Sequence, residues 1–261
     1  MTHAGERPRD GAGRRVLGVI PARIASQRLP RKPLAPLGGR PLVQWVYEAA
    51  SRARGLDELV VATDDESIAS AVAGFGGTPV MTRHDHASGT DRVAEVARGR
   101  DWAQVIVNVQ GDEPLLPPEY IDAGIAALAE DGVRMATLVT PVRDAGELAD
   151  PGVAKVVADR NGNALYFSRS PIPFVRDRAR AAGATVAMRH IGIYFFERSA
   201  LFEFVEHAPS PLEEAEGLEQ LRALENGIAI RLVRVPAATP HVDTAEDLER
   251  VERIVSPTQG G

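Results

Sequence analysis

Short apolar segments that alternate with amphipathic ones are the feature that most constrains how this chain can fold. Helical periodicity at Pro41–Arg54, at Pro117–Ala129 and after a cap at Thr63 or Asp64 separates runs of strand length. Those runs are Val16–Ile20, Leu59–Ala62, Val80–Met81, Val105–Val109 and Met135–Pro141. Strands that alternate with helices form right-handed βαβ units. We therefore predict an α/β fold with a mostly parallel, twisted sheet flanked by helices.

The alternation breaks down between about residues 150 and 200. Val153–Ala158 and Asn163–Ser168 flank Asp159–Gly162, whose residues favour a β-hairpin turn. A strand is expected at His190–Phe196 and a helix at Leu218–Asn226. We predict a single domain over residues 16–255, with an inserted β-arm at about 150–200. Residues 1–15 carry charge but no apolar core, which is typical of a disordered tail and excludes a signal peptide.

Net charge and residue types exclude several classes of function. The formal net charge is −6, which disfavours broad nucleic-acid binding. The sequence has no cysteine, so disulfides, thiolate catalysis and cysteine-ligated zinc are excluded, and the composition fits a reducing compartment. A cytoplasmic location is expected. No apolar run reaches the roughly 20 residues that a membrane-spanning helix needs. An anionic substrate would therefore require positive charge gathered at one place.

Positive charge is gathered in the proline-rich loop Pro21–Pro36, which follows the first predicted strand. Four cationic side chains lie within ten residues: Arg23, Arg28, Arg31 and Lys32. Ligands of open parallel sheets bind at the carboxyl ends of strands. Charge-assisted hydrogen bonds suit the roughly four negative charges of a nucleoside triphosphate. The loop has neither a Walker motif nor GxGxxG, so kinase and dehydrogenase functions lose support. The alternative is a solvated basic loop.

Carboxylates in two distant segments are candidate metal ligands. Gln110, Asp112 and Glu113 come just after the central predicted strand. A carboxylate there can hold Mg²⁺, which takes one or two protein carboxylates with phosphate oxygens and water, although Asp112 could instead cap a turn. Thr244 suits the cap of the last helix, which leaves Asp243 free as a second ligand. Spacing alone cannot pair aspartates that lie 131 positions apart.

Other polar segments have weaker signals. Arg83 and Ser88 could read a base edge, although Ser88 could simply cap a helix. His84 and His86 have no third nitrogen ligand nearby, which disfavours a metal site. A further set either faces a substrate or forms ordinary surface contacts: Arg169 and His190 at strand ends, and Glu216, Glu219 and Gln220 on one predicted helical face that is solvent-exposed by default.

A series of segments gives the chain a specific resemblance. In order, they are VIPARIASQRLPRKPL, VATDDESI, TRHDHASGTDR, VNVQGDEPLL, ALYFSRSPIPF, RHIGIYFF, PSPLEEAEGLEQLR and VDTAEDLERV. Together they resemble the CMP-Kdo synthetases, the 3-deoxy-manno-octulosonate cytidylyltransferases. The similarity runs from about Val16 to Arg253. It implies a Rossmann-like nucleotidyltransferase fold, with a β-arm that forms a homodimer.

The resemblance also implies roles for individual residues. The CTP-binding residues would be Arg23, Ser26, Arg28, Lys32, Arg83 and Ser88. The sugar acid would be held by Gln110, Arg169, His190, Glu219 and Gln220. Mg²⁺ would be held by Asp112 and Asp243, and these two aspartates would be catalytic together with Arg23 and Lys32. His190 would bind the sugar rather than act as a base.

The implied reaction transfers CMP from CTP to the anomeric hydroxyl of Kdo and releases pyrophosphate. The product would serve lipopolysaccharide synthesis in the cytoplasm. One alternative substrate is a modified Kdo or another keto-sugar acid such as sialic acid. A second alternative is a non-catalytic nucleotide-binding protein, which the presence of Lys32, Asp112 and Asp243 disfavours.

Two positions depart from the family pattern. Arg31 stands where the family loop often has glycine, and His241 stands where glycine often precedes Val-Asp-Thr. Neither change removes an expected ligand. Arg31 could contact phosphate or only line the entrance, and both departures leave room for a related substrate.

Overall fold

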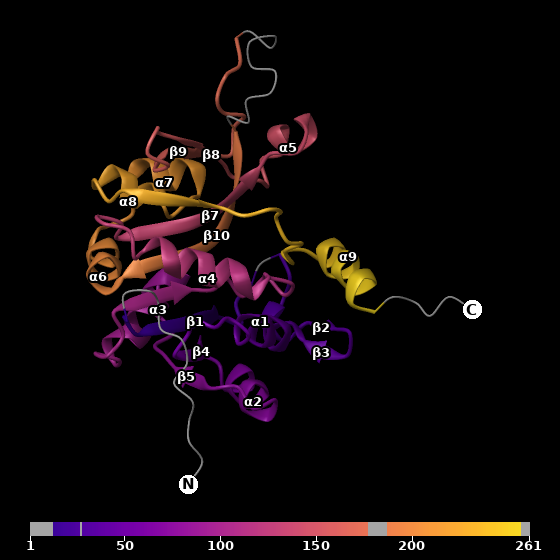
Figure 1. The fold of residues 1–261 in the computed structure, drawn as a ribbon. Helices are drawn as coiled ribbons and strands as arrows, with labels where there is room; N and C mark the ends of the chain where they lie inside the picture. Colours follow the sequence, from indigo (N-terminus) through magenta and orange to yellow (C-terminus); the bar gives the residue numbers. More distant parts are fainter. Residues whose placement is uncertain (1–12, 27, 177–186, 257–261) are drawn as a thin grey trace. The chain divides into compact units, whose positions relative to one another are not determined.

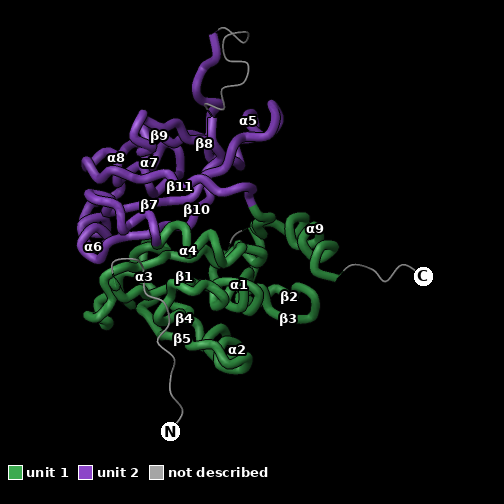
Figure 2. The backbone as a smooth tube through the Cα atoms, in the orientation of Figure 1, with its two compact units in different colours: residues 1–125, 239–261 green, residues 126–238 purple. Residues whose placement is uncertain are grey.

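Two compact units make up the chain (Figure 2), in a computed structural model that describes residues 13–26, 28–176 and 187–256. Unit 1 comprises residues 1–125 and 239–261, and unit 2 comprises residues 126–238. Residues 1–12 of the predicted tail and residues 177–186 of the predicted arm lie outside the described residues. The single-domain boundaries and the dimerising arm stay predictions.

Unit 1 contains a parallel sheet in the strand order β6-β1-β4-β5. Its strands are β1 (Val16–Ala22), β4 (Glu58–Thr63), β5 (Pro79–Met81) and β6 (Val105–Asn108). In register, Val19 pairs with Val60 of β4 and with Asn108 of β6. The apolar side chains of β1 are almost wholly buried, as expected for a central parallel strand. The predicted strands are confirmed, with ends shifted by one or two residues.

Helices and a small hairpin complete unit 1 (Figure 1). They are η1 (Lys32–Leu34), β2 (Pro36–Leu37), β3 (Arg40–Pro41), α1 (Leu42–Ala50), α2 (Glu66–Gly74), α3 (Gly89–Arg98), α9 (Ala245–Val255) and α4 (Pro118–Ala127), which spans the division between the units. The cap of α2 is Asp65, whose carboxylate accepts from the amides of Ser67 and Ile68. The predicted cap at Thr63 or Asp64 is therefore wrong, because Thr63 still belongs to β4 and Asp64 pairs with Arg92.

Unit 2 is built on a mixed sheet. The strand β7 (Met135–Pro141) runs parallel to β11 (Ile230–Arg234) and antiparallel to β10 (Met188–Glu197). The predicted hairpin is confirmed: β8 (Lys155–Ala158) pairs with β9 (Ala164–Ser168), and β8 also pairs with β10. The helices of this unit are α5 (Ala145–Ala149), α6 (Arg198–Glu206), α7 (Pro211–Glu216) and α8 (Leu221–Glu225).

The turn between α7 and α8 corrects one prediction. Gly217, at φ 61°, ends α7 in the left-handed conformation, and α8 begins only at Leu221. Glu216, Glu219 and Gln220 therefore do not share one helical face. Solvent exposure is also wrong for Gln220, which is 2% exposed.

The predicted fold class is confirmed, since parallel βαβ units carry helices such as α2 and α3 against their strands. Within the part of the chain that the structure describes, no helix combines the length and apolar character needed to cross a membrane.

Candidate functional site

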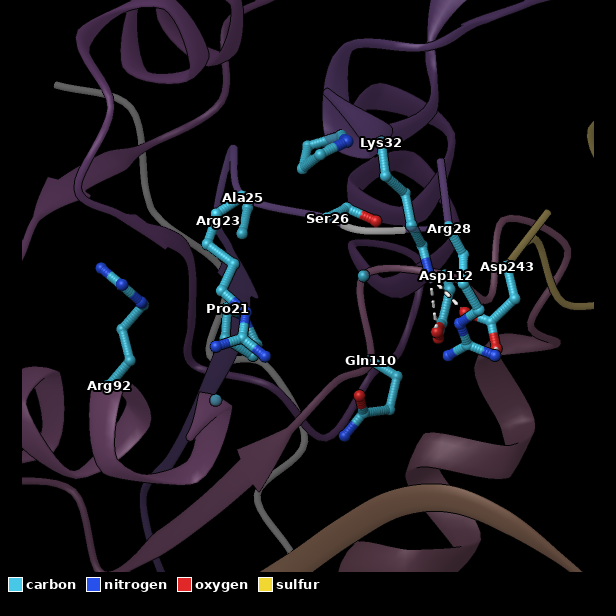
Figure 3. Close-up of a pocket in the computed structure, with 14 residues that line it drawn as sticks. Pro21, Arg23, Ala25, Ser26, Arg28, Lys32, Arg92, Gln110, Asp112 and Asp243 are labelled. Carbon is cyan, nitrogen blue, oxygen red and sulfur yellow. Dashed lines mark hydrogen bonds and ion pairs between the residues drawn. The ribbon is translucent and has the colours of Figure 1, made fainter. Parts of the chain in front are cut away.

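The loops after β1 and β6 meet a C-terminal segment around a cavity of about 920 Å³ in unit 1 (Figure 3). Its lining includes five of the predicted site residues of the basic loop and the β6 loop, which are Arg23, Ser26, Arg28, Lys32 and Gln110, together with both predicted metal ligands, Asp112 and Asp243. Gly111 allows the loop after β6 to lie close to β1, because a Cβ there would lie only 3.2 Å from the carbonyl oxygen of Pro21.

Lys32 joins the two aspartates. Its Nζ donates to Asp112 Oδ2 at 2.9 Å and to Asp243 Oδ1 at 2.7 Å (Figure 3). A backbone hydrogen bond of 2.9 Å from the amide of Val242 to the carbonyl of Asp112 holds the two segments side by side. The structure therefore brings together two carboxylates that sequence spacing could not pair.

The pKa values of this cluster favour its charged forms. Burial alone would lower the pKa of Lys32, but the charge of Asp112 and the hydrogen bond with Asp243 outweigh burial and raise it. Burial would raise the pKa of Asp243, but the hydrogen bond and charge of Lys32, with the charge of Arg28, lower it. Both groups are thus held as an ion pair near neutral pH.

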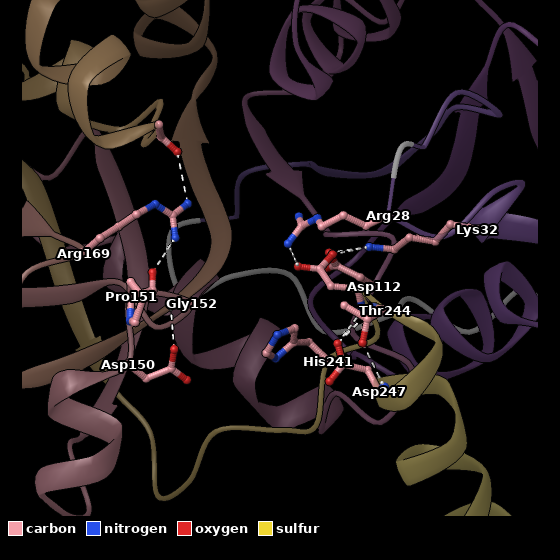
Figure 4. Close-up of polar contacts among 12 residues, drawn as sticks. Arg28, Lys32, Asp112, Asp150, Pro151, Gly152, Arg169, His241, Thr244 and Asp247 are labelled. Carbon is pink, nitrogen blue, oxygen red and sulfur yellow. Dashed lines mark hydrogen bonds and ion pairs between the residues drawn. The ribbon is translucent and has the colours of Figure 1, made fainter.

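The Asp243 carboxylate can contact Lys32 and Arg28 because another residue, Thr244, caps α9. Thr244 accepts from the amide of Asp247, and Asp247 accepts from the amides of Asp243 and Thr244 (Figure 4). The predicted Thr244 cap is confirmed. Asp243 directs its carboxylate to Lys32 and to Arg28, whose Nη1 lies 3.1 Å from Oδ2.

Two carboxylates that converge on one ammonium group also suit a small divalent cation. Mg²⁺ takes one or two carboxylates and completes its shell with water and phosphate oxygens. Among the described residues, no group of three or more His, Cys, Asp or Glu side chains is arranged to hold a metal. The donor set at Asp112 and Asp243 thus fits a metal that is shared with a phosphate ligand rather than one caged by protein.

Arg31 belongs to the basic loop but not to the cavity lining. It caps η1 at φ 55°, the left-handed region that favours glycine, which explains why a glycine fits this position. Its Nη2 donates to Ser67 Oγ of α2 at 3.2 Å. Counting Arg31 among the phosphate cations is therefore not supported by its position.

The helix cap predicted as one role of Ser88 is confirmed in the segment before α3. Ser88 forms a capping box with Asp91, and the Arg83 guanidinium pairs with Asp85 at 3.1 Å. The described lining of the cavity includes Gly89 and Arg92 rather than Arg83 and Ser88. The direct base contacts of Arg83 and Ser88 stay predictions.

Sequence reasoning missed Arg92. It is 2% exposed, lines the cavity and pairs with Asp64 at 3.2 Å. Its position in the sequence could have indicated this role: Arg92 lies one helical turn after the Ser88 cap, and α3 begins at the cavity. His86, in the same region, pairs with Glu95.

Two of the predicted sugar-binding residues meet inside unit 2. His190 Nδ1 lies 3.5 Å from Gln220 Nε2, and His190 Nε2 lies 2.9 Å from Thr137 Oγ1. Tyr194 donates to Gln220 Oε1 at 2.9 Å, and Thr137 donates to the carbonyl of Ile193 at 2.8 Å. The directions of these bonds require His190 Nδ1 to accept and Nε2 to donate, so the ring is the neutral Nε2–H tautomer.

The surroundings of His190 keep it uncharged. The rings of Phe167 and Tyr194 flank it, with centroid distances of 5.1 and 5.5 Å. Burial lowers the pKa of His190 to about 3. A neutral ring whose two nitrogens are both hydrogen-bonded agrees with a binding or structural role rather than with that of a general base.

Arg169 and Glu219 are the other predicted sugar ligands of unit 2. Arg169 donates to the carbonyl of Pro151 at 2.9 Å (Figure 4) and to the carbonyl of Glu216 at 2.7 Å. Glu219 lies in the turn between α7 and α8. Glu216 accepts from Ser168 Oγ at 2.6 Å, so this carboxylate is engaged with β9 rather than with solvent alone.

Comparisons with known proteins agree with this architecture. A family model described as cytidylyltransferase matches residues 17–231. The 3-deoxy-manno-octulosonate cytidylyltransferase of Geobacter sulfurreducens is 52% identical over 244 residues, which cover 90% of this chain and 97% of that protein.

Solved structures extend the comparison. The CMP:2-keto-3-deoxy-manno-octonic acid synthetase complexed with CTP is 42% identical, with a TM-score of 0.87, over 93% of this chain and 99% of the other. The 4-diphosphocytidyl-2C-methyl-D-erythritol synthase of Anaerococcus prevotii shares the fold at 15% identity, with a TM-score of 0.63, over 94% and 97% of the two chains.

The left-handed conformation at Arg31 predicts that a glycine variant is more stable than an alanine variant there, which is the reverse of the order inside a helix. Arg31→Gly should be more stable than Arg31→Ala by about 1 kcal/mol, because only the alanine retains the steric cost of positive φ. Urea unfolding of both variants measures this difference. At Ser70, in the exposed middle of α2, alanine should be the more stable by about 1 kcal/mol. The same order at both positions would contradict the assignment.

Neutral His190 predicts a loss of stability in mild acid. The unfolded histidine binds a proton below about pH 6.5, whereas folded His190 does so only near pH 3, so the unfolded state gains protons first. Between pH 7 and pH 5, protonation of the unfolded histidine should lower the free energy of unfolding by about 2 kcal/mol. His190→Gln should abolish this pH-dependent loss. Urea unfolding at both pH values tests it. His84→Gln, in an exposed loop, is the control; an equal change in both variants would refute the prediction.

Proposed function

The chain belongs to the 3-deoxy-manno-octulosonate cytidylyltransferase family, and from that premise we propose that it transfers CMP from CTP to the anomeric hydroxyl of Kdo, releasing pyrophosphate. The observation that carries this proposal is the cavity where Lys32 meets Asp112 and Asp243, lined by further cations at the carboxyl ends of parallel strands. Such a cavity combines phosphate-binding and metal-binding groups.

The cations of the cavity have different tasks in this proposal. Arg23 has no ion-pair partner among the described residues, so its charge is available to phosphate oxygens. Lys32 and Arg28 are paired with carboxylates. Together these three cations would offset the charge of the leaving pyrophosphate, and Ser26 would add a hydroxyl donor.

Asp112 and Asp243 are the residues that would hold magnesium. When bound, the ion would lower the pKa of the attacking hydroxyl and polarise the α-phosphate of CTP. The anomeric oxygen forms a bond to the α-phosphorus as the bond to the pyrophosphate oxygen breaks, and the hydroxyl proton is released. Among the described residues the lining contains no histidine, and its two carboxylates are assigned here to the metal, so it provides no separate general base.

Recognition of the two substrates would fall to separate groups. The start of α3, with Gly89 and Arg92 at the cavity, would lie toward the nucleotide, with Arg83 and Ser88 supporting that segment. Gln110 would contact the sugar acid, as would the residues of unit 2 that the resemblance assigns to it, which are Arg169, His190, Glu219 and Gln220. We further propose a homodimer in the cytoplasm, the compartment that supplies CTP.

A substrate panel tests the reaction. Pyrophosphate release should require CTP, Kdo and Mg²⁺ together, and removal of Mg²⁺ by a chelator should stop it. Sialic acid and 8-amino-modified Kdo, each with CTP, test the alternative substrates. Release with sialic acid but not with Kdo would overturn the substrate assignment, and release with other triphosphates at equal rates would overturn the preference for CTP.

Neutralising either carboxylate should impair turnover. Asp112→Asn and Asp243→Asn are each expected to lower kcat by about 100-fold or more, because each removes a charged oxygen ligand from a two-carboxylate site. Steady-state kinetics at saturating CTP measure this effect. Asp131→Asn, at an exposed position, is the matched control and should retain near wild-type kcat. Near wild-type turnover of Asp112→Asn would exclude it as a metal ligand.

A further inference from the structure

Lys32 lies where a bound cation would be expected. Its Nζ contacts Asp112 at 2.9 Å and Asp243 at 2.7 Å, and its side chain is only 16% exposed. The two carboxylate side chains are themselves mostly buried, at 25% and 23% exposure. Two carboxylates held this close to one atom repel each other unless positive charge lies between them. Lys32 supplies that charge.

Among the described residues, no other lysine or arginine forms an ion pair with both carboxylates. Arg28 contacts only Asp243, from a side chain that is 69% exposed, and Arg23 makes no ion pair with any described residue. An ammonium group has three hydrogen-bond donors, and Lys32 uses two of them on the aspartates. It therefore cannot neutralise both carboxylates and also give most of its donors to a triphosphate.

From this geometry, and resting on the proposed function, we propose that Lys32 is the built-in counter-ion of the Asp112–Asp243 pair and exchanges with a divalent cation that arrives with the nucleotide. In the free enzyme Lys32 competes with the cation for the same oxygens. Once a divalent cation neutralises the carboxylates, the donors of Lys32 are released to phosphate oxygens. Cation and triphosphate then favour each other's binding through one side chain, and this coupling is reciprocal.

The backbone around Lys32 allows such an exchange by movement of the side chain alone. Lys32 begins η1, where its amide donates to the carbonyl of Leu29 at 3.1 Å and its carbonyl accepts from the amide of Ala35 at 3.1 Å. The neighbouring Arg31 anchors the loop to Ser67 of α2. The carboxylates are held by the backbone bond between Val242 and Asp112, so the pair stays assembled when the ammonium group leaves.

The test measures binding of Mn²⁺, as a probe for Mg²⁺, to the full chain without nucleotide, by the loss of the free-ion EPR signal. Lys32→Met should bind Mn²⁺ at least about tenfold more tightly than wild type, because the competing charge is removed from both carboxylates. Lys32→Gln, which keeps amide donors but no charge, should behave similarly and serves if the methionine variant does not fold. Lys32→Arg retains the charge and should stay close to wild type.

Two controls isolate the exchange. Arg23→Met removes a charge from the same cavity without breaking an ion pair among the described residues, and should tighten Mn²⁺ binding by less than about threefold. Adding Asp112→Asn to Lys32→Met should abolish the gain. If neither uncharged Lys32 variant binds Mn²⁺ more tightly than Arg23→Met, the proposal is overturned. Wild-type turnover with CTP and Kdo is assayed separately, so failure of the counter-ion proposal and failure of the proposed function give different results.

Discussion

The shared hydrogen bonds of Lys32 with Asp112 and Asp243 are the interaction on which the site depends. They join the loop after β1, the loop after β6 and the segment before α9, three parts of the chain that are distant in sequence. Partly buried charges are costly to leave unpaired, so each of the three groups constrains the other two. The backbone bond from Val242 to Asp112 then fixes the separation of the segments. The basic loop and the carboxylate pair thereby become one site.

Unit 2 also contains a network of buried polar side chains, but these side chains are uncharged. His190, Gln220, Tyr194 and Thr137 form a directional chain of hydrogen bonds in which each donor has a defined acceptor. Burial keeps the imidazole neutral, which makes the chain sensitive to acid but removes any need for a counter-ion. In the proposed function, this network would give the sugar acid oriented polar groups, whereas phosphate and metal in unit 1 would be bound by charged groups that exchange partners.

Local sequence signals predicted the features that are set by neighbouring residues. The buried strands, the hairpin turn at Asp159–Gly162 and the Thr244 cap all follow from side-chain period, turn propensity and capping chemistry within a few positions. Predictions failed where a tertiary contact decided between equivalent local choices. Asp65 rather than Asp64 caps α2, because Asp64 pairs with Arg92. Gln220 is buried where it accepts a hydrogen bond from Tyr194, which is distant in sequence.

The sequence by itself determined the α/β class, the basic loop and the family, because periodicity, local charge and ordered motifs are properties of short segments. Only the tertiary structure decided which charges meet. Asp243 lies 131 positions from Asp112, and no local rule specifies which cation bridges them. Arg31 and Lys32 are adjacent in the chain, yet the left-handed backbone at Arg31 directs one side chain to α2 while the other meets the aspartates. Charge can be counted in a sequence, but its partners depend on the folded path of the backbone.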